Sequence, residues 1–191
     1  MGQAAADGRD ILHGDVHRQM VSLLGIGPVD GRAKLRGIFF LLADDVPGIR
    51  GQLGYSEGMD GRVADRALEH LRDAGMASEG PGGISITGRG REAAGGITGM
   101  IDGRIMRLLG EYRELLGGMT DREMLAFIYA MFPAMASGSP GYADIKPDME
   151  HLIMSLVEKE KISSGRASEL LGVTQDKIFN NMRRMGIQIF Y

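Results

Sequence analysis

The sequence predicts a mainly α-helical chain that carries one short β-hairpin and ends in a pair of short helices. Apolar residues recur at helical spacing over most of its length, as Val63, Ala67 and Leu71 do. A glycine-rich turn at 80–83 separates two short runs of strand-forming residues. Near the C-terminus, two helical segments flank Gly172, which is where a helix commonly ends in a left-handed residue.

Composition narrows the classes of protein that the chain can belong to. Its 191 residues, 43% of them hydrophobic, suffice for one large domain or two small ones. The net charge of −3 gives no overall attraction to nucleic acid, so such binding would need a local basic patch. Without cysteine there is no disulfide, thiol catalysis or cysteine-ligated metal. Because residues 1–14 do not resemble a signal peptide and no apolar run could cross a bilayer, we expect a cytoplasmic protein without membrane contact.

The N-terminal half has the element order of a winged helix. A short helix around Val16 to Leu24 precedes it, three helical segments lie in 31–73, and a hairpin follows at 76–87. The residues Leu68, Leu71, Ala74-Gly75-Met76 and Ile86-Thr87-Gly88-Arg89-Gly90-Arg91-Glu92 resemble the "L…L…AGL…LT-x-x-G-R-E" ending of prokaryotic winged-helix regulators. That resemblance implies a fold rather than a particular function.

The charges of this half give it a secondary set of candidate DNA contacts. Its third helix mixes two arginines with three acids on the outer side: Arg62, Asp65, Arg66, Glu69 and Asp73. The wing tip carries no Lys or Arg, and the obvious phosphate contacts lie just beyond it. The secondary candidates are therefore Arg62, Arg66, Arg89 and Arg91. The alternative is a winged helix for protein docking or dimerisation, with its charges paired along the helix.

The middle of the chain reads as a helical connector. Apolar residues with 4-3-4-3 spacing suit a coiled-coil-like contact, and they are Ile101, Ile105, Leu108, Tyr112 and Leu115. This stripe could pair two subunits into a homodimer or pack against the rest of the chain. A further helix is predicted to begin at Thr120, with Glu123 completing a capping box.

The stretch 161–187 is predicted to form a helix-turn-helix. Ser164 is the expected N-cap of its first helix, and Thr174 that of its second. Ile178, Met182 and Met185 define the inner face of the second helix. The side chains that could reach phosphates and base edges are Arg166, Gln175, Lys177, Asn180, Arg183 and Arg184.

This stretch also resembles a family of small prokaryotic helix-turn-helix proteins. The similarity rests on Gly165 to Thr174, then Phe179 and the exit Arg184-Met185-Gly186-Ile187, against a family core of G-K-A-A-E-L-A-G. Because that family is described as antitoxin-like, the resemblance implies a regulator that binds double-stranded DNA and could have a toxin-like protein partner.

No motif in the sequence indicates an enzyme, a cofactor or a metal site. A nucleophile elbow, a metal-binding His/Glu motif and a dinucleotide fingerprint are all missing, and the glycines at 88–99 do not form a phosphate loop. His13 and His17 share a helix face, but no third ligand stands near them in the sequence, so they read as solvated histidines. We expect no catalytic residue.

These observations predict five segments. They are an N-terminal arm with a short helix (1–30), a winged-helix domain (31–92), a helical connector (93–135), a linker (136–143) and a helix-turn-helix domain (144–191). The expected function is a DNA-binding transcriptional regulator. The alternative is a protein-interaction adaptor without DNA binding. A basic patch on the C-terminal hairpin would favour DNA, and an exposed apolar patch would favour a protein partner.

Overall fold

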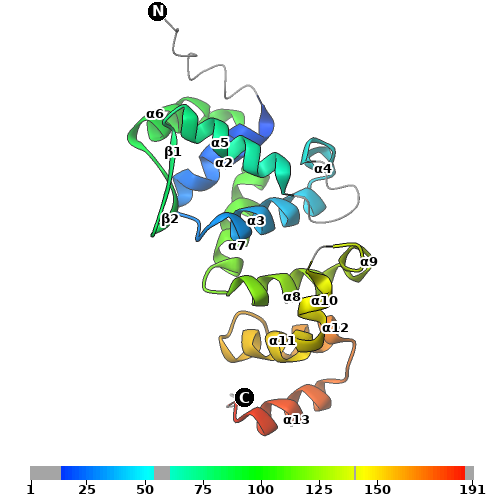
Figure 1. Cartoon of the computed structure of the whole chain (residues 1–191). Helices are drawn as coiled ribbons and strands as arrows, with labels where there is room; N and C mark the ends of the chain where they lie inside the picture. The colour runs from blue at the N-terminus through cyan, green and yellow to red at the C-terminus, as the bar shows by residue number, and fades with distance from the viewer. Residues whose placement is uncertain (1–13, 54–60, 140, 188–191) are drawn as a thin grey trace, which may run out of the picture. The chain divides into compact units, whose positions relative to one another are not determined.

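A computed structural model describes residues 14–53, 61–139 and 141–187. The chain is mainly helical with a small two-stranded antiparallel sheet, as predicted (Figure 1). It divides into two compact units, Met1–Gly117 and Gly118–Tyr191, which we call the N-terminal and C-terminal units. None of the described helices combines the length and apolarity needed to cross a membrane.

The N-terminal unit contains six α-helices, a short 3-10 helix and the hairpin among its described residues. The helices are α2 (Asp15–Ile26), α3 (Arg32–Asp45), α4 (Pro47–Leu53), α5 (Arg62–Asp73), α6 (Gly88–Ile97), η1 (Thr98–Met100) and α7 (Gly103–Leu116). The strands are β1 (Ala77–Gly80) and β2 (Gly83–Ile86).

The first helix of this unit lies in its core. Met20 and Leu23 of α2 are fully buried together with Phe39 of α3 and Leu68 of α5. Helix α2 packs against α5, α6, α7 and β2, which are distant in the sequence. The predicted arm at 1–30 therefore differs from the structure, because the apolar residues of α2 complete the core that α3 and α5 cannot close alone.

The hairpin is anchored to the segment between α2 and α3. Ala77 pairs with Ile86 and Gly80 with Gly83, and the backbone of Val29 forms an isolated bridge with Ile84. Gly83 has φ 94°, and a Cβ there would lie 2.4 Å from the carbonyl oxygen of Val29. Only glycine fits this close approach, which fixes the β-hairpin against the segment that links α2 to α3.

The glycines after the hairpin lie in α6 and η1. Thr87 starts α6, since its hydroxyl accepts a hydrogen bond from the Gly90 N–H at 3.1 Å and donates to the Gly75 carbonyl at 2.7 Å. The predicted domain end at residue 92 therefore falls inside α6. This threonine ties the start of α6 to the turn that follows α5. The glycine content of the segment does not reveal this contact, because it depends on a hydroxyl and a carbonyl twelve residues apart.

Helix α7 belongs to the N-terminal unit and packs on α2 and α3. Its fully buried residues are Leu109 and Leu116, seven positions apart. The predicted stripe through Ile105, Leu108 and Tyr112 is only half-buried. The face that this helix buries is therefore rotated away from the 4-3-4-3 stripe, and the predicted connector at 93–135 is split between the two units.

The C-terminal unit is helical throughout its described part. It contains α8 (Asp121–Met131), α9 (Pro133–Ala136), α10 (Tyr142–Ile145), η2 (Lys146–Asp148), α11 (Met149–Glu158), α12 (Ser164–Leu171) and α13 (Gln175–Met185). The capping box predicted at the start of α8 is confirmed: Thr120 and Glu123 exchange side-chain to backbone hydrogen bonds.

A buried carboxylate joins α8 to α11. Glu123 is only 3% exposed and accepts hydrogen bonds from Lys159 Nζ at 2.7 and 2.8 Å and from Ser155 Oγ at 2.6 Å. Burial alone would raise the pKa of Glu123, but the bonds from Lys159, Ser155 and Thr120 outweigh it and lower the pKa to about 2. The ionised carboxylate is thus part of the packing between these helices.

The segment predicted as a linker lies inside the C-terminal unit. Ala136 is buried, and the ring of Tyr142 meets that of Tyr129 on α8 edge-on, with 5.4 Å between centroids. The chain instead divides at Gly117 and Gly118, where Gly118 has φ 76°. Small and turn-forming residues at 136–142 suggested a boundary, but the aromatic contact and the burial of Ala136 hold this loop against its own unit.

Candidate nucleic-acid interface

The predicted helix-turn-helix corresponds to α12 and α13. Gly172 ends α12 with φ 62°, and Gly186 ends α13 with φ 74°. The Thr174 hydroxyl accepts from the Lys177 N–H at 3.4 Å and caps α13 as predicted. The cap of α12 is Ser163, one residue before the predicted Ser164, and its hydroxyl accepts from the Arg166 N–H at 3.0 Å. Each boundary is therefore set by a local side chain or glycine.

The two helices pack through small and aliphatic side chains. Ala167 of α12 is fully buried, as are Ile178 of α13 and Ile153 of α11. Met182 is buried as predicted, but Met185 is 39% exposed, so its assignment to the inner face was wrong. Met185 is the last residue of α13, one turn beyond the buried Met182. Helices α11, α12 and α13 thus form a three-helix group, and α8 also contacts α12.

The predicted DNA-contacting side chains are all exposed. Five of them lie on α13, and the sixth is on α12: Gln175, Lys177, Asn180, Arg183, Arg184 and Arg166. Asn181, beside them, is half-buried and donates its side-chain N–H to Glu150 of α11. This hydrogen bond between side chains links α13 to α11. Asn181 therefore lies at the border between the exposed side of α13 and its packed side.

The cations of α13 have no acidic partner among the described residues. No carboxylate oxygen of that part of the chain lies within 4.0 Å of Lys177, Arg183 or Arg184. Arg166 differs, since it pairs with Glu169 on its own helix at 2.8 Å. Within 161–187 there are five Lys or Arg against two Asp or Glu, so this stretch is basic in an acidic chain.

Two acids of α5, Asp65 and Glu69, are by contrast held by arginines of α3. Arg36 forms a two-bond pair with Asp65, at 2.7 and 3.0 Å, and Arg32 Nη2 lies 2.6 Å from Glu69. The sequence suggested pairing along α5 itself, and Arg72 does pair with Glu69 at 3.0 Å, but Asp65 and Glu69 also pair with a helix that lies about thirty residues earlier. These pairs neutralise the outer side of α5, which would meet phosphates in a winged-helix complex.

The β-hairpin is joined to the same network of ion pairs. Glu79 on β1 accepts from Arg32 at 2.7 Å and lies 3.3 Å from Arg72. The hydrogen bonds from Arg32 lower the pKa of Glu79, and the nearby charges of Arg32 and Arg72 add to this effect. An ionised carboxylate thus stands on the β-hairpin, at the place where the wing of a DNA-binding winged helix would present a cation.

The four secondary candidates are exposed, but two of them contact backbone carbonyls. Arg66 Nε donates to the carbonyl of Arg62 at 3.4 Å, and Arg91 donates to the Ile86 carbonyl at 3.3 Å. Arg89 is exposed near the start of α6, three residues after β2 ends at Ile86. Two of the four secondary candidates are therefore engaged by carbonyls of their own unit.

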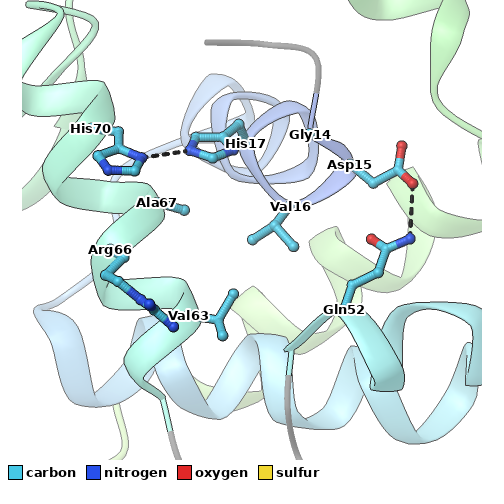
Figure 2. A pocket seen from close by; sticks show the side chains of 9 residues that line it. All are labelled: Gly14, Asp15, Val16, His17, Gln52, Val63, Arg66, Ala67 and His70. Carbon is cyan, nitrogen blue, oxygen red and sulfur yellow. Dashed lines mark hydrogen bonds between the residues drawn. The ribbon is translucent and has the colours of Figure 1, made fainter.

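The N-terminal unit also holds a pocket of about 520 Å³ (Figure 2). It lies between the start of α2 and one side of α5, with Gln52 of α4 at its other wall. Val16, Val63 and Ala67 give it an apolar lining, and Asp15 accepts from Gln52 Nε2 at 3.0 Å. His17 and His70 face each other at its edge, whereas His13 lies outside the described residues. Sequence spacing could not find His70, which is 53 residues from its partner.

Neither metal-ligating side chains nor similarity to known proteins assigns a function to the described part of the chain. Among the described residues, no group of three or more His, Asp or Glu side chains is placed to hold a metal ion. Comparison with protein-family models, curated proteins and solved structures finds no match to this chain.

Proposed function

We propose that the protein is a regulator that binds double-stranded DNA through α12 and α13. The observation that carries this proposal is the outer side of α13. Lys177, Arg183 and Arg184 are exposed there, and no carboxylate of the described residues pairs with them. A cation that already pairs with a carboxylate must give up that pair before it can bind a phosphate, so it contributes little free energy to DNA binding. These three cations have no such pair to break, and they are available to displace counterions from DNA.

The order of side chains on α13 suits entry of its first turn into the major groove. Gln175 and Lys177 stand at that end, and Asn180 follows one turn later. Amide side chains can bond adenine with two hydrogen bonds, and lysine can bond guanine or phosphate. Arg183 and Arg184 lie in the last turn, where they also complement the helix dipole and could reach the backbone of the duplex.

A protein-docking adaptor is the alternative, and its support on this surface is weaker. Met185 is the large apolar side chain that α13 exposes, at 39%, and it stands next to Arg183 and Arg184. One methionine among cations does not make an apolar patch of the size that marks a protein interface. The antitoxin-like role, a toxin-like partner and a homodimer are narrower proposals that rest on the sequence resemblance and on the half-buried stripe of α7.

The N-terminal unit is proposed to be a winged helix that does not bind DNA and instead docks a protein partner or senses a signal. Its element order, with Val29 bridged to Ile84 between α2 and α3, supports that topology. The ion pairs of Asp65, Glu69 and Glu79 with arginines of α3 favour a docking or sensing role for it.

The test is salt-dependent binding of the full chain to duplex DNA, measured by fluorescence anisotropy. Lys177→Ala and Arg184→Ala should each lower affinity, and each should reduce the slope of log affinity against log salt by about 1. The matched control is Arg107→Ala, which removes an exposed arginine from α7. Affinity that stays unchanged in both α13 variants would remove this face from the interface and leave the adaptor as the better proposal.

A further inference from the structure

The pocket of the N-terminal unit combines apolar walls with an arginine (Figure 2). Val16 of α2 lines one side of it, and Val63 and Ala67 of α5 line the other. Arg66 stands on the same side as Val63 and Ala67. The volume of about 520 Å³ lies within the range of about 300–1,000 Å³ in which clefts hold small ligands.

The guanidinium of Arg66 has N–H donors left over for a ligand. Its Nε donates to the carbonyl of Arg62 at 3.4 Å. Among the described residues, no carboxylate oxygen lies within 4.0 Å of any nitrogen of this side chain. The terminal nitrogens Nη1 and Nη2 therefore keep their hydrogen-bonding capacity and their charge for a group that enters the pocket.

The carboxylate in the pocket lining does not neutralise this cation. Asp15 accepts a hydrogen bond from Gln52 Nε2 at 3.0 Å and forms an ion pair with Arg18 on its own helix. The imidazoles of His17 and His70 are engaged with each other, since His17 Nε2 lies 3.3 Å from His70 Nδ1 in a hydrogen bond at the edge of the pocket. The lining thus offers one open positive charge beside apolar walls.

We propose that this pocket binds a small organic anion with a single carboxylate and a short aliphatic body. A guanidinium and a carboxylate match in shape and form two parallel hydrogen bonds. Low-dielectric walls concentrate the field of a nearby cation, which favours an anion over a neutral molecule of the same shape. The methyl groups of Val16, Val63 and Ala67 gain from contact with an aliphatic chain, which an inorganic anion lacks. One arginine matches one negative charge, so a polyphosphate fits the lining poorly.

This inference goes beyond the proposed DNA binding and is independent of it. Every residue that lines the pocket belongs to the N-terminal unit, whereas the proposed DNA contacts lie in the C-terminal unit. Failure of either proposal would leave the other in place.

The experiment titrates the full chain with sodium hexanoate and follows the methyl signals of the protein by NMR. We expect saturable shifts of the signals of Val16, Val63 and Ala67, and no shift for Val173 in the C-terminal unit. Two further compounds separate the parts of the recognition. Hexan-1-ol keeps the apolar body without the charge, and acetate keeps the charge without the body. Each should bind at least about fivefold more weakly than hexanoate.

Two variants test the two sides of the proposed contact. Arg66→Gln removes the charge and should weaken hexanoate binding at least about fivefold, while the affinity for hexan-1-ol stays the same. Val63→Phe fills the pocket from a half-buried position and should abolish binding of both compounds. Arg107→Gln, which replaces an exposed arginine of α7 outside the pocket, is the matched control and should bind hexanoate as the wild type does.

The result that decides is the one for Arg66→Gln, because Arg66 is exposed and its replacement leaves the core of the unit intact even if Val63→Phe does not fold. Equal affinity of wild type and Arg66→Gln for hexanoate would overturn the proposal. Hexan-1-ol that binds the wild type as tightly as hexanoate does would also overturn it, since the pocket would then not select an anion. A wild type whose pocket methyl signals do not respond to hexanoate would show that this hollow holds no such ligand.

Discussion

At the scale of single residues, the C-terminal unit depends on one buried charge. Glu123 closes the capping box of α8 and receives three further hydrogen bonds from Lys159 and Ser155 of α11. Bonds to a charged group are stronger than those between neutral groups, provided that the charge is fully satisfied. Local capping and the packing of two helices therefore meet in one carboxylate.

Replacing this carboxylate tests that role directly. Glu123→Gln should destabilise the protein by about 2 kcal/mol at pH 7, because Lys159 and Ser155 lose a charged acceptor. The measurement is urea unfolding followed by circular dichroism. Glu158→Gln, an exposed glutamate on α11, is the control and should change the free energy of unfolding by less than about 0.5 kcal/mol.

The same pair predicts a pH dependence with a definite sign. The pKa of Glu123 is about 2 in the folded chain and 4.5 ordinarily, so its contribution is present above pH 4.5 and is lost as the pH falls toward 2. The difference in unfolding free energy between wild type and Glu123→Gln should therefore shrink over that window. A difference that stays constant from pH 7 to pH 2.5 would mean that ionisation of Glu123 does not stabilise the fold.

At the scale of elements, α5 and α13 are the two helices that could enter a groove, and their charges are arranged in opposite ways. Asp65 and Glu69 of α5 lie against Arg36 and Arg32 of α3, and Glu79 brings the β-hairpin into the same network. Helix α13 has no such partners among the described residues, and its polar link to α11 goes through the neutral Asn181. Paired charges hold the N-terminal unit together, whereas the charges of α13 remain open to a ligand.

Under the proposed DNA binding, this contrast predicts which of the two helices contacts the duplex. The double variant Arg62→Ala, Arg66→Ala removes both arginines of the outer side of α5 and should change DNA affinity less than Lys177→Ala alone. Anisotropy titrations at two salt concentrations measure both affinities and slopes. A larger loss in the α5 double variant than in Lys177→Ala would assign the main contact to the N-terminal unit instead.

At the scale of the whole molecule, the chain is divided after Gly117, and α8 is part of the C-terminal unit. Met124, Phe127 and Ile128 of α8 are buried, and α8 packs on α11 and α12. A helix-turn-helix domain that began at residue 144 would leave the apolar face of α11 without this cover.

Two fragments distinguish the observed boundary from the one that the sequence predicted. Fragment 118–191 should unfold cooperatively and bind DNA, whereas fragment 144–191 should lack a cooperative transition because it has lost α8 and the Glu123 contacts. Thermal unfolding by circular dichroism and anisotropy with the same duplex measure both properties. Cooperative unfolding of 144–191 on its own would show that α8 is dispensable.

Short-range features of this protein were determined by its sequence alone. The capping box of Thr120 and Glu123, the cap at Thr174 and the glycine that ends α12 involve neighbours within a few residues, so their geometry follows from local backbone chemistry. The hairpin with its Pro81-Gly82 turn belongs to the same class. The sequence also indicated which polar side chains of α13 lie outward, since Ile178 and Met182 set the buried side.

Only the tertiary structure decided which distant groups meet. It placed α2 in the core, turned the buried face of α7 onto Leu109 and Leu116, and moved the division of the chain to Gly117. It also paired Asp65 with Arg36 and His17 with His70, which lie 29 and 53 residues apart. Such contacts depend on how whole helices pack. Helical periodicity predicts which side of a helix is buried, but it does not predict which other element covers that side.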